Sequence, residues 1–137
     1  MKELKKILEQ SLVDDSCMSV TIHCNIPKLN LIINDSRQML GYGIGLDRQQ
    51  GFTLSIWIDK NSNKGKKLKE LLNENNFLTE FKAFEAGRSV IYLKDFRREI
   101  ELLERTIHHL LGKINKGSSG QFFELTATRT DGTFRLE

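Results

Sequence analysis

Cysteine and proline are scarce in this sequence, whose 137 residues include two cysteines and one proline. Cys17 and Cys24, on or beside one expected strand, are too few and too close together to form the disulfide framework of a small secreted domain. Pro-rich and low-complexity tracts are also missing, which excludes a mainly disordered or collagen-like chain. We therefore expect a folded protein in a reducing, cytoplasmic setting.

Long hydrophobic runs are missing as well. The uncharged apolar stretches are only a few residues long, far short of the roughly 20 residues that cross a bilayer. The first residues are charged and begin an amphipathic helix, so we expect no signal peptide. The sequence therefore predicts no membrane insertion.

What the chain does contain is enough for one hydrophobic core. A chain of this length removes roughly two-thirds of its unfolded surface from water, and 39% of its residues are hydrophobic. The stretch with the composition of a linker is the Gly- and Ser-containing segment 116–120. We expect a single α+β domain over 1–115, this linker, and a C-terminal β-hairpin tail over 121–137.

Hydrophobic periodicity predicts the elements of the first half. Apolar residues recur at three- and four-residue steps in a helix over 2–13, and at alternate positions in a strand over 18–24. A short strand is expected over 29–33. The segment 40–46 alternates apolar residues with three glycines, which predicts another strand, paired as a hairpin with a strand over 52–58.

The glycines leave one face of the expected strand 40–46 without side chains. If Leu46 lies opposite Phe52, then Gly41 lies opposite Trp57, and the indole ring would cover the glycines. A register shift of one residue would place the indole on the other face. This pairing is therefore a specific prediction of the sequence.

The second half of the chain predicts helices around a second hairpin. A helix is expected over 63–75, a hairpin over 81–94, and a long helix over 96–115 that Asp95 can cap. The complete order is α-β-β-β-β-α-β-β-α plus the C-terminal hairpin. This order predicts the α+β class, with an antiparallel sheet of about five to six strands flanked by helices.

The last helix carries an apolar stripe with steps of three and four residues, surrounded by mixed charge. Such a stripe either covers the sheet or forms an interface with a second copy or another protein. We consider both roles. The residues proposed for a partner interface are Trp57 and, from this stripe, Ile100, Leu103, Ile107, Leu110 and Ile114.

A basic cluster is the most uneven feature of the charge distribution. Residues 59–70 contain five lysines against two carboxylates, a net charge of +3, whereas the remainder of the chain is neutral. Cations in the first turns of a helix oppose its dipole, so helix stability does not explain them. The cluster is either a solvated face or a site for a phosphate-rich partner such as a nucleic acid. It consists of Lys60, Lys64, Lys66, Lys67 and Lys69.

No residue pattern identifies a catalytic, metal or cofactor site. The glycines of segment 41–45 do not open a helix, as a phosphate-binding loop would. His23 and Cys24 point to opposite faces of one strand, and His108 and His109 diverge on a helix, which disfavours a shared metal. We therefore assign no catalytic residue, no metal ligand and no cofactor.

The order of elements resembles that of type III secretion chaperones and the related bacterial sensory-regulator-like domains. The resemblance covers residues 2–115, and the hairpin over 81–93 and the helix over 96–115 fit it best. It implies an antiparallel sheet flanked by helices and a dimeric protein-binding module.

These observations lead to three functional hypotheses. The first is a non-enzymatic binding module, homodimeric, that holds the apolar segment of a protein partner through its sheet face and last helix. The second is a nucleic-acid or phosphate-binding accessory protein that uses the basic cluster. The third is an enzyme of unknown class, whose catalytic groups would converge from distant positions.

Overall fold

The computed structural model describes residues 2–24, 29–114, 123–129 and 132–135. The chain forms α1 (Lys2–Asp14), β1 (Met18–Cys24), β2 (Leu29–Asp35), β3 (Phe52–Asp59) and α2 (Asn63–Leu72). It continues through β4 (Lys82–Ala86), β5 (Ser89–Asp95), α3 (Ile100–Ile114), β6 (Phe123–Arg129) and β7 (Gly132–Arg135). Three helices and an antiparallel arrangement of strands confirm the predicted α+β class for the described part of the chain.

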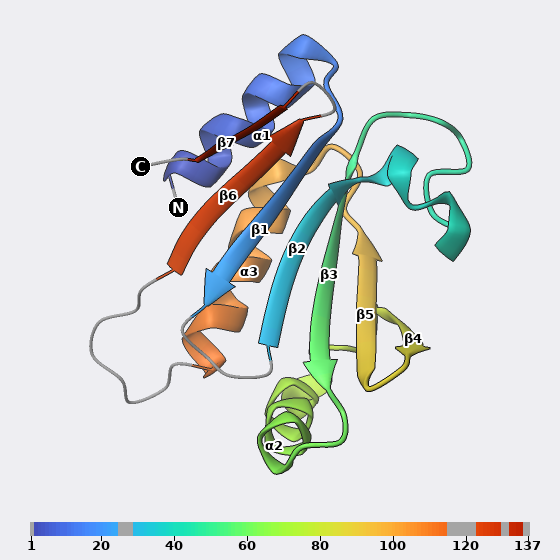
Figure 1. Cartoon of the computed structure of the whole chain (residues 1–137), viewed down its shortest axis with the longest axis vertical. Helices are drawn as coiled ribbons and strands as arrows, with labels where there is room; N and C mark the ends of the chain where they lie inside the picture. The colour runs from blue at the N-terminus through green and yellow to red at the C-terminus, as the bar shows by residue number, and fades with distance from the viewer. Residues whose placement is uncertain (1, 25–28, 115–122, 130–131, 136–137) are drawn as a thin grey trace.

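The described strands form one antiparallel sheet in the order β4-β5-β3-β2-β1-β6-β7. Figure 1 shows α1 and α3 behind this sheet, whereas α2 lies at the end where β3 finishes. Apolar residues alternate along the central strands, so one face of the sheet is packed against α1 and α3. On β3 this face consists of Phe52, Leu54, Ile56 and Ile58, which are all buried.

The C-terminal hairpin belongs to the same sheet. Seven residue pairs join β6 to β1, from Met18 opposite Arg129 to Cys24 opposite Phe123. Ala127 of β6 is completely buried in the main core. The hairpin therefore extends the sheet of the main domain, and the predicted linker 116–120 lies outside the described residues.

The prediction of a strand over 40–46 is wrong. Two short 3-10 turns, Ser36–Gln38 and Leu40–Tyr42, occupy part of this region, and Gly43 and Gly45 have φ angles of 75° and 74°. A β-strand has negative φ throughout, so the two glycines supply a conformation that other residues rarely adopt. A Cβ atom at Gly45 would lie 2.1 Å from the carbonyl oxygen of Ser36, which shows how closely the chain folds back on itself.

The absence of that strand changes the sheet pairing. β3 pairs with β2 and β5, and Trp57 lies between Asn30 and Ile91 instead of opposite Gly41. The predicted hairpin between 40–46 and 52–58 and the proposed cross-strand contact with Gly41 are therefore wrong. The chain instead connects β2 to β3 by the segment 36–51, part of which packs across the sheet face that the helices leave uncovered.

Two helix boundaries also differ from the prediction. α2 ends at Leu72 and is followed by a 3-10 turn at Glu74–Asn76, whereas the predicted helix ran to residue 75. α3 begins at Ile100 instead of residue 96. Arg97 has a positive φ of 55°, which a right-handed helix does not allow, so the helix cannot begin at residue 96. Asp95 therefore caps a turn before the helix, where it accepts a hydrogen bond from the Arg97 amide at 2.9 Å.

Candidate functional site

The apolar stripe of α3 lies inside the molecule. Ile100, Leu103, Ile107 and Leu110 are buried in the main core, and Leu103 is 0% exposed. The side chain of Ile114 lies outside the described residues. The stripe therefore covers the sheet, which was one of its two expected roles, and the four buried residues are not accessible to a partner of the folded chain.

A second apolar cluster lies on the opposite face of the sheet. It has buried residues from β5 and the segment 36–51, and half-buried aromatic residues around them. The aromatic residues include Trp57, whose indole N–H donates a hydrogen bond to Ser55 Oγ at 3.2 Å. We call this group the far-face cluster, and it consists of Met39, Tyr42, Ile44, Trp57, Phe84, Ile91 and Leu93.

Strand β4 is the outer strand of the sheet on this side. It has five residues and is joined to β5 through a turn at Gly87 and Arg88, and β5 is its only partner among the described strands. Four of its residues are exposed, and Phe84, which is half-buried, packs its ring against Tyr42 at a centroid distance of 5.2 Å. An outer strand leaves one row of backbone N–H and C=O groups without a strand partner.

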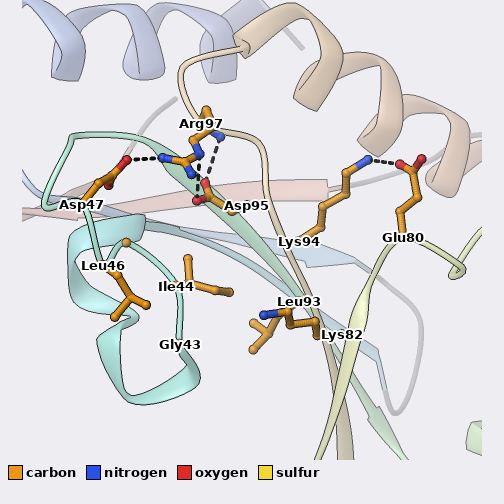
Figure 2. A pocket seen from close by; sticks show the side chains of 11 residues that line it. Gly43, Ile44, Leu46, Asp47, Glu80, Lys82, Leu93, Lys94, Asp95 and Arg97 are labelled. Atoms are coloured by element: carbon orange, nitrogen blue, oxygen red, sulfur yellow. Dashed lines mark hydrogen bonds and ion pairs between the residues drawn. The ribbon is translucent and has the colours of Figure 1, made fainter.

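A cleft lies where β5 extends beyond β4. β5 continues to Asp95, whereas its pairing with β4 ends where Lys82 meets Leu93. The cleft has a volume of about 520 Å³, and Figure 2 shows that its walls come from three separate parts of the chain. The lining consists of Gly43, Ile44, Gly45, Leu46, Asp47, Glu80, Lys82, Leu93, Lys94, Asp95 and Arg97.

Ion pairs hold two sides of the cleft. Arg97 pairs with Asp47, and its Nε atom lies 3.5 Å from Asp95 Oδ2. On the other side, Lys94 Nζ lies 2.6 Å from Glu80 Oε2. Each of the three carboxylates in the lining therefore has a cationic partner within the cleft.

These contacts shift the ionisation of the exposed groups. The backbone N–H of Gln49, followed by the Arg97 guanidinium, lowers the pKa of Asp47 below its ordinary value. The Lys94 ammonium likewise lowers the pKa of Glu80, and Asp47 raises the pKa of Arg97. The ion pairs therefore favour the charged form of every one of these groups.

Sequence reasoning missed this cleft. Its charged residues are spread over residues 47, 80–82 and 94–97, and none of them forms a motif in the sequence. A signal that could have found them is the run Lys94, Asp95 and Arg97 at the end of a strand that is otherwise apolar. The folding back of segment 43–47 brings Asp47 to the same place, and this turn depends on the two glycines with positive φ.

A partly buried ion pair joins Asp35, the last residue of β2, to Arg37 in the turn that follows. Asp35, which is 1% exposed, accepts hydrogen bonds from Arg37 Nε at 3.1 Å and from its terminal nitrogen at 2.8 Å. Arg37 also donates to Asp15, and the hydrogen bonds with Asp35 raise the pKa of the guanidinium. Burial, followed by the charge of Asp35, raises the pKa of the Cys17 thiol above its ordinary value.

The basic cluster is exposed at the end of the sheet. Ser62 caps α2 by accepting a hydrogen bond from the Gly65 amide at 2.9 Å. Lys60 is half-buried and lies 3.4 Å from Glu85, and its backbone N–H donates to the carbonyl of Arg88. The exposed members, all on α2, are Lys64, Lys66, Lys67 and Lys69.

The described residues contain no group of three or more His, Cys, Asp or Glu side chains placed to hold a metal ion. The longest described helix, α3, has 15 residues, and none of the described helices combines the length and apolar character of a membrane span. Comparisons of the chain with protein-family models, curated proteins and solved structures found no match. The resemblance to type III secretion chaperones stays a prediction.

Proposed function

We propose that this protein is a non-enzymatic binding module that holds an extended apolar segment of a protein partner along strand β4. The observation that carries this proposal is the position of β4, an exposed outer strand whose Phe84 joins the far-face cluster. A bound segment would add one strand to the sheet and place alternate side chains on that cluster.

The backbone of β4 supplies the first part of the binding energy. Main-chain hydrogen bonds to an outer strand give affinity that is independent of the partner's sequence. Lys82 and Glu85 on this short strand limit uncontrolled pairing with other edges, because charged side chains discourage edge-to-edge association. We therefore expect a partner that carries complementary charges beside its apolar residues.

The side chains next to β4 supply the specificity. Phe84 and Tyr42 pack against each other on the far face, and Leu40, in the same 3-10 turn as Tyr42, is 46% exposed. Burial of exposed apolar surface stabilises a complex by roughly 25 cal/mol for each Å² removed from water. An aromatic pair at the edge of the sheet is therefore a suitable contact for an apolar side chain of the partner.

A peptide selected from a random display library against the full chain would test the proposal. Its binding should change the fluorescence of Trp57, the single tryptophan, because the indole belongs to the far-face cluster. N-methylation at alternate positions of the peptide should abolish binding in one series and leave it intact in the other. This alternation is expected only when the peptide pairs as a strand.

Matched variants make the test specific. Phe84→Ser should weaken peptide binding by at least about tenfold, whereas Phe77→Ser, at a half-buried phenylalanine that packs against the main core, should not. Equal effects of both variants, or binding that tolerates every N-methylation, would contradict the proposal. A concentration-dependent dimer that Phe84→Ser dissociates would identify a second copy of the chain as the partner.

The exposed lysines of α2 favour a second candidate, the binding of a nucleic acid. Polyanion binding weakens steeply with salt because neutralised phosphates release their counterions. A fluorescein-labelled single-stranded oligonucleotide should bind at low salt, and Lys66→Ala with Lys67→Ala should reduce both the affinity and the salt slope. Lys6→Ala with Arg98→Ala removes the same charge elsewhere on the exposed surface. Equal losses in both double variants would show that only the net charge matters.

A further inference from the structure

The cleft at the end of β5 has a charge arrangement of which the binding of a partner to β4 uses only Lys82. Its lining carries three cations and three carboxylates, so a highly charged ligand would leave the site unbalanced. Its volume of about 520 Å³ falls within the range of small-molecule sites, which is roughly 300 to 1,000 Å³. The cleft is therefore of suitable size for a small ligand without net charge.

The ion pairs leave one cation and one negative charge unmatched. Arg97 is shared between Asp47 and Asp95, and Lys94 neutralises Glu80. In the part of the chain that the structure describes, the ammonium of Lys82 has no ion pair and no hydrogen-bond partner. The cleft therefore presents one free ammonium, and on its other side two carboxylates that share one guanidinium (Figure 2).

Apolar side chains lie between these charges. Ile44 and Leu93 are buried and form part of the wall, and Leu93 is the cross-strand partner of Lys82. Leu46 is 73% exposed although it lines the cleft next to Asp47. A ligand with an apolar side chain would cover Leu46, which the folded chain alone leaves in water.

We propose that this cleft binds a small apolar zwitterion, either a free amino acid or a dipeptide with an apolar side chain. The carboxylate of the ligand pairs with Lys82, and its ammonium pairs with the carboxylates on the opposite side, Asp47 and Asp95, which share one guanidinium. The apolar side chain lies against Ile44, Leu46 and Leu93. This site shares Lys82 with the proposed strand pairing at β4. Phe84 does not line the cleft and Leu46 is not part of β4, so variants at these two residues test the two proposals independently.

Titrations of the full-length, ¹⁵N-labelled protein by NMR test the proposal. The probes are L-leucine, leucyl-leucine, N-acetyl-leucyl-leucine and leucyl-leucinamide. A saturable shift of amides in residues 43–47, 80–82 and 93–97 is expected with L-leucine or with leucyl-leucine, and the tighter of the two identifies the source. The two blocked dipeptides should bind at least about tenfold more weakly than leucyl-leucine, because each loses one charge-assisted contact.

Two pairs of variants separate the contacts. Lys82→Met should weaken leucyl-leucine about tenfold and leave leucyl-leucinamide unchanged, because the amide has no carboxylate to lose. Lys66→Met, on α2, should change neither. Leu46→Ser should weaken both zwitterions, whereas Leu40→Ser, at an exposed leucine of the same segment that does not line the cleft, should have no effect.

Several results would overturn the proposal. The first is the absence of a saturable shift with either zwitterion at millimolar concentrations. The second is an N-acetylated dipeptide that binds as tightly as the free one, which would show that the cleft does not recognise an ammonium. Equal effects of Lys82→Met on the dipeptide and on its amide would show that Lys82 does not contact the carboxylate.

Discussion

The same substitution at two helical glycines should change the stability in opposite directions. Glycine in a helix interior costs roughly 1 kcal/mol relative to alanine, so Gly→Ala is ordinarily stabilising. Gly112 of α3 is exposed, and a Cβ atom there would have no atom within 4 Å. Gly112→Ala should therefore raise the free energy of unfolding by about 1 kcal/mol.

Gly65 of α2 is in the opposite situation. A Cβ atom there would lie 1.6 Å from the carbonyl oxygen of Asp59 and 3.0 Å from Ser62 Oγ. The first turn of α2 would have to move away from the end of β3, which disturbs packing at a cost of about 1 to 3 kcal/mol. The same movement strains the Ser62 cap, which contributes about 1 kcal/mol. After the gain in helix propensity, Gly65→Ala should lower the free energy of unfolding by about 2 kcal/mol.

Urea denaturation of the wild type and the two variants, followed by circular dichroism, measures both effects. The dependence of the free energy on urea should be unchanged in both variants, because neither alters the surface exposed on unfolding. For a chain of this size, the loss at Gly65 corresponds to a fall in melting temperature of roughly 6 to 10 °C. A Gly65→Ala variant as stable as the wild type would refute the close packing of α2 against β3. Destabilisation by both variants would instead show that the surroundings do not decide the sign.

Three further predictions follow from buried groups. Leu103→Glu should unfold the chain, whereas Leu102→Glu, at a residue that is 36% exposed, should leave it folded. Circular dichroism and light scattering measure both outcomes. A folded Leu103→Glu monomer would show that this face of α3 is not part of the core. Asp35→Asn should lower the free energy of unfolding by about 2 to 3 kcal/mol, because Arg37 loses its buried charged partner and keeps the exposed Asp15. A loss below about 0.5 kcal/mol in urea denaturation would contradict this. Because the pKa of Cys17 is raised in the folded state, the unfolded thiol ionises first as the pH rises, so stability should fall once the pH exceeds about 8.5, the ordinary pKa of a thiol. Cys17→Ser should reduce that fall, and an identical pH dependence would contradict the assignment.

The periodicity of the sequence determined most of the regular elements. A helix over the first 13 residues, the strand 18–24 and the hairpin around Gly87 all occur close to their predicted positions. These predictions succeed because the alternation of buried and exposed residues has a different period in helices and in strands. The cap at Ser62 was also predictable, because it depends on a local hydrogen bond.

The segment 40–46 shows where periodicity is insufficient. Its alternation of apolar residues and glycine fits a strand, but glycine also allows positive φ, and sequence alone does not distinguish the two. The decision came from tertiary packing, because Ile44 and Tyr42 join the far-face cluster when the chain turns at Gly43 and Gly45. Only the fold therefore shows that this segment covers the sheet.

Tertiary structure also decided which residues are available for function. The sequence indicated the apolar stripe of α3 but not whether sheet or solvent faces it, because an amphipathic pattern is the same for a core and for an interface. The cleft residues Asp47, Lys82 and Arg97 are distant in the sequence, and the pairing of β4 with β5 and the turn after Gly43 bring them together. Local periodicity determines secondary structure, whereas contacts between distant residues determine which charges and apolar groups share one site.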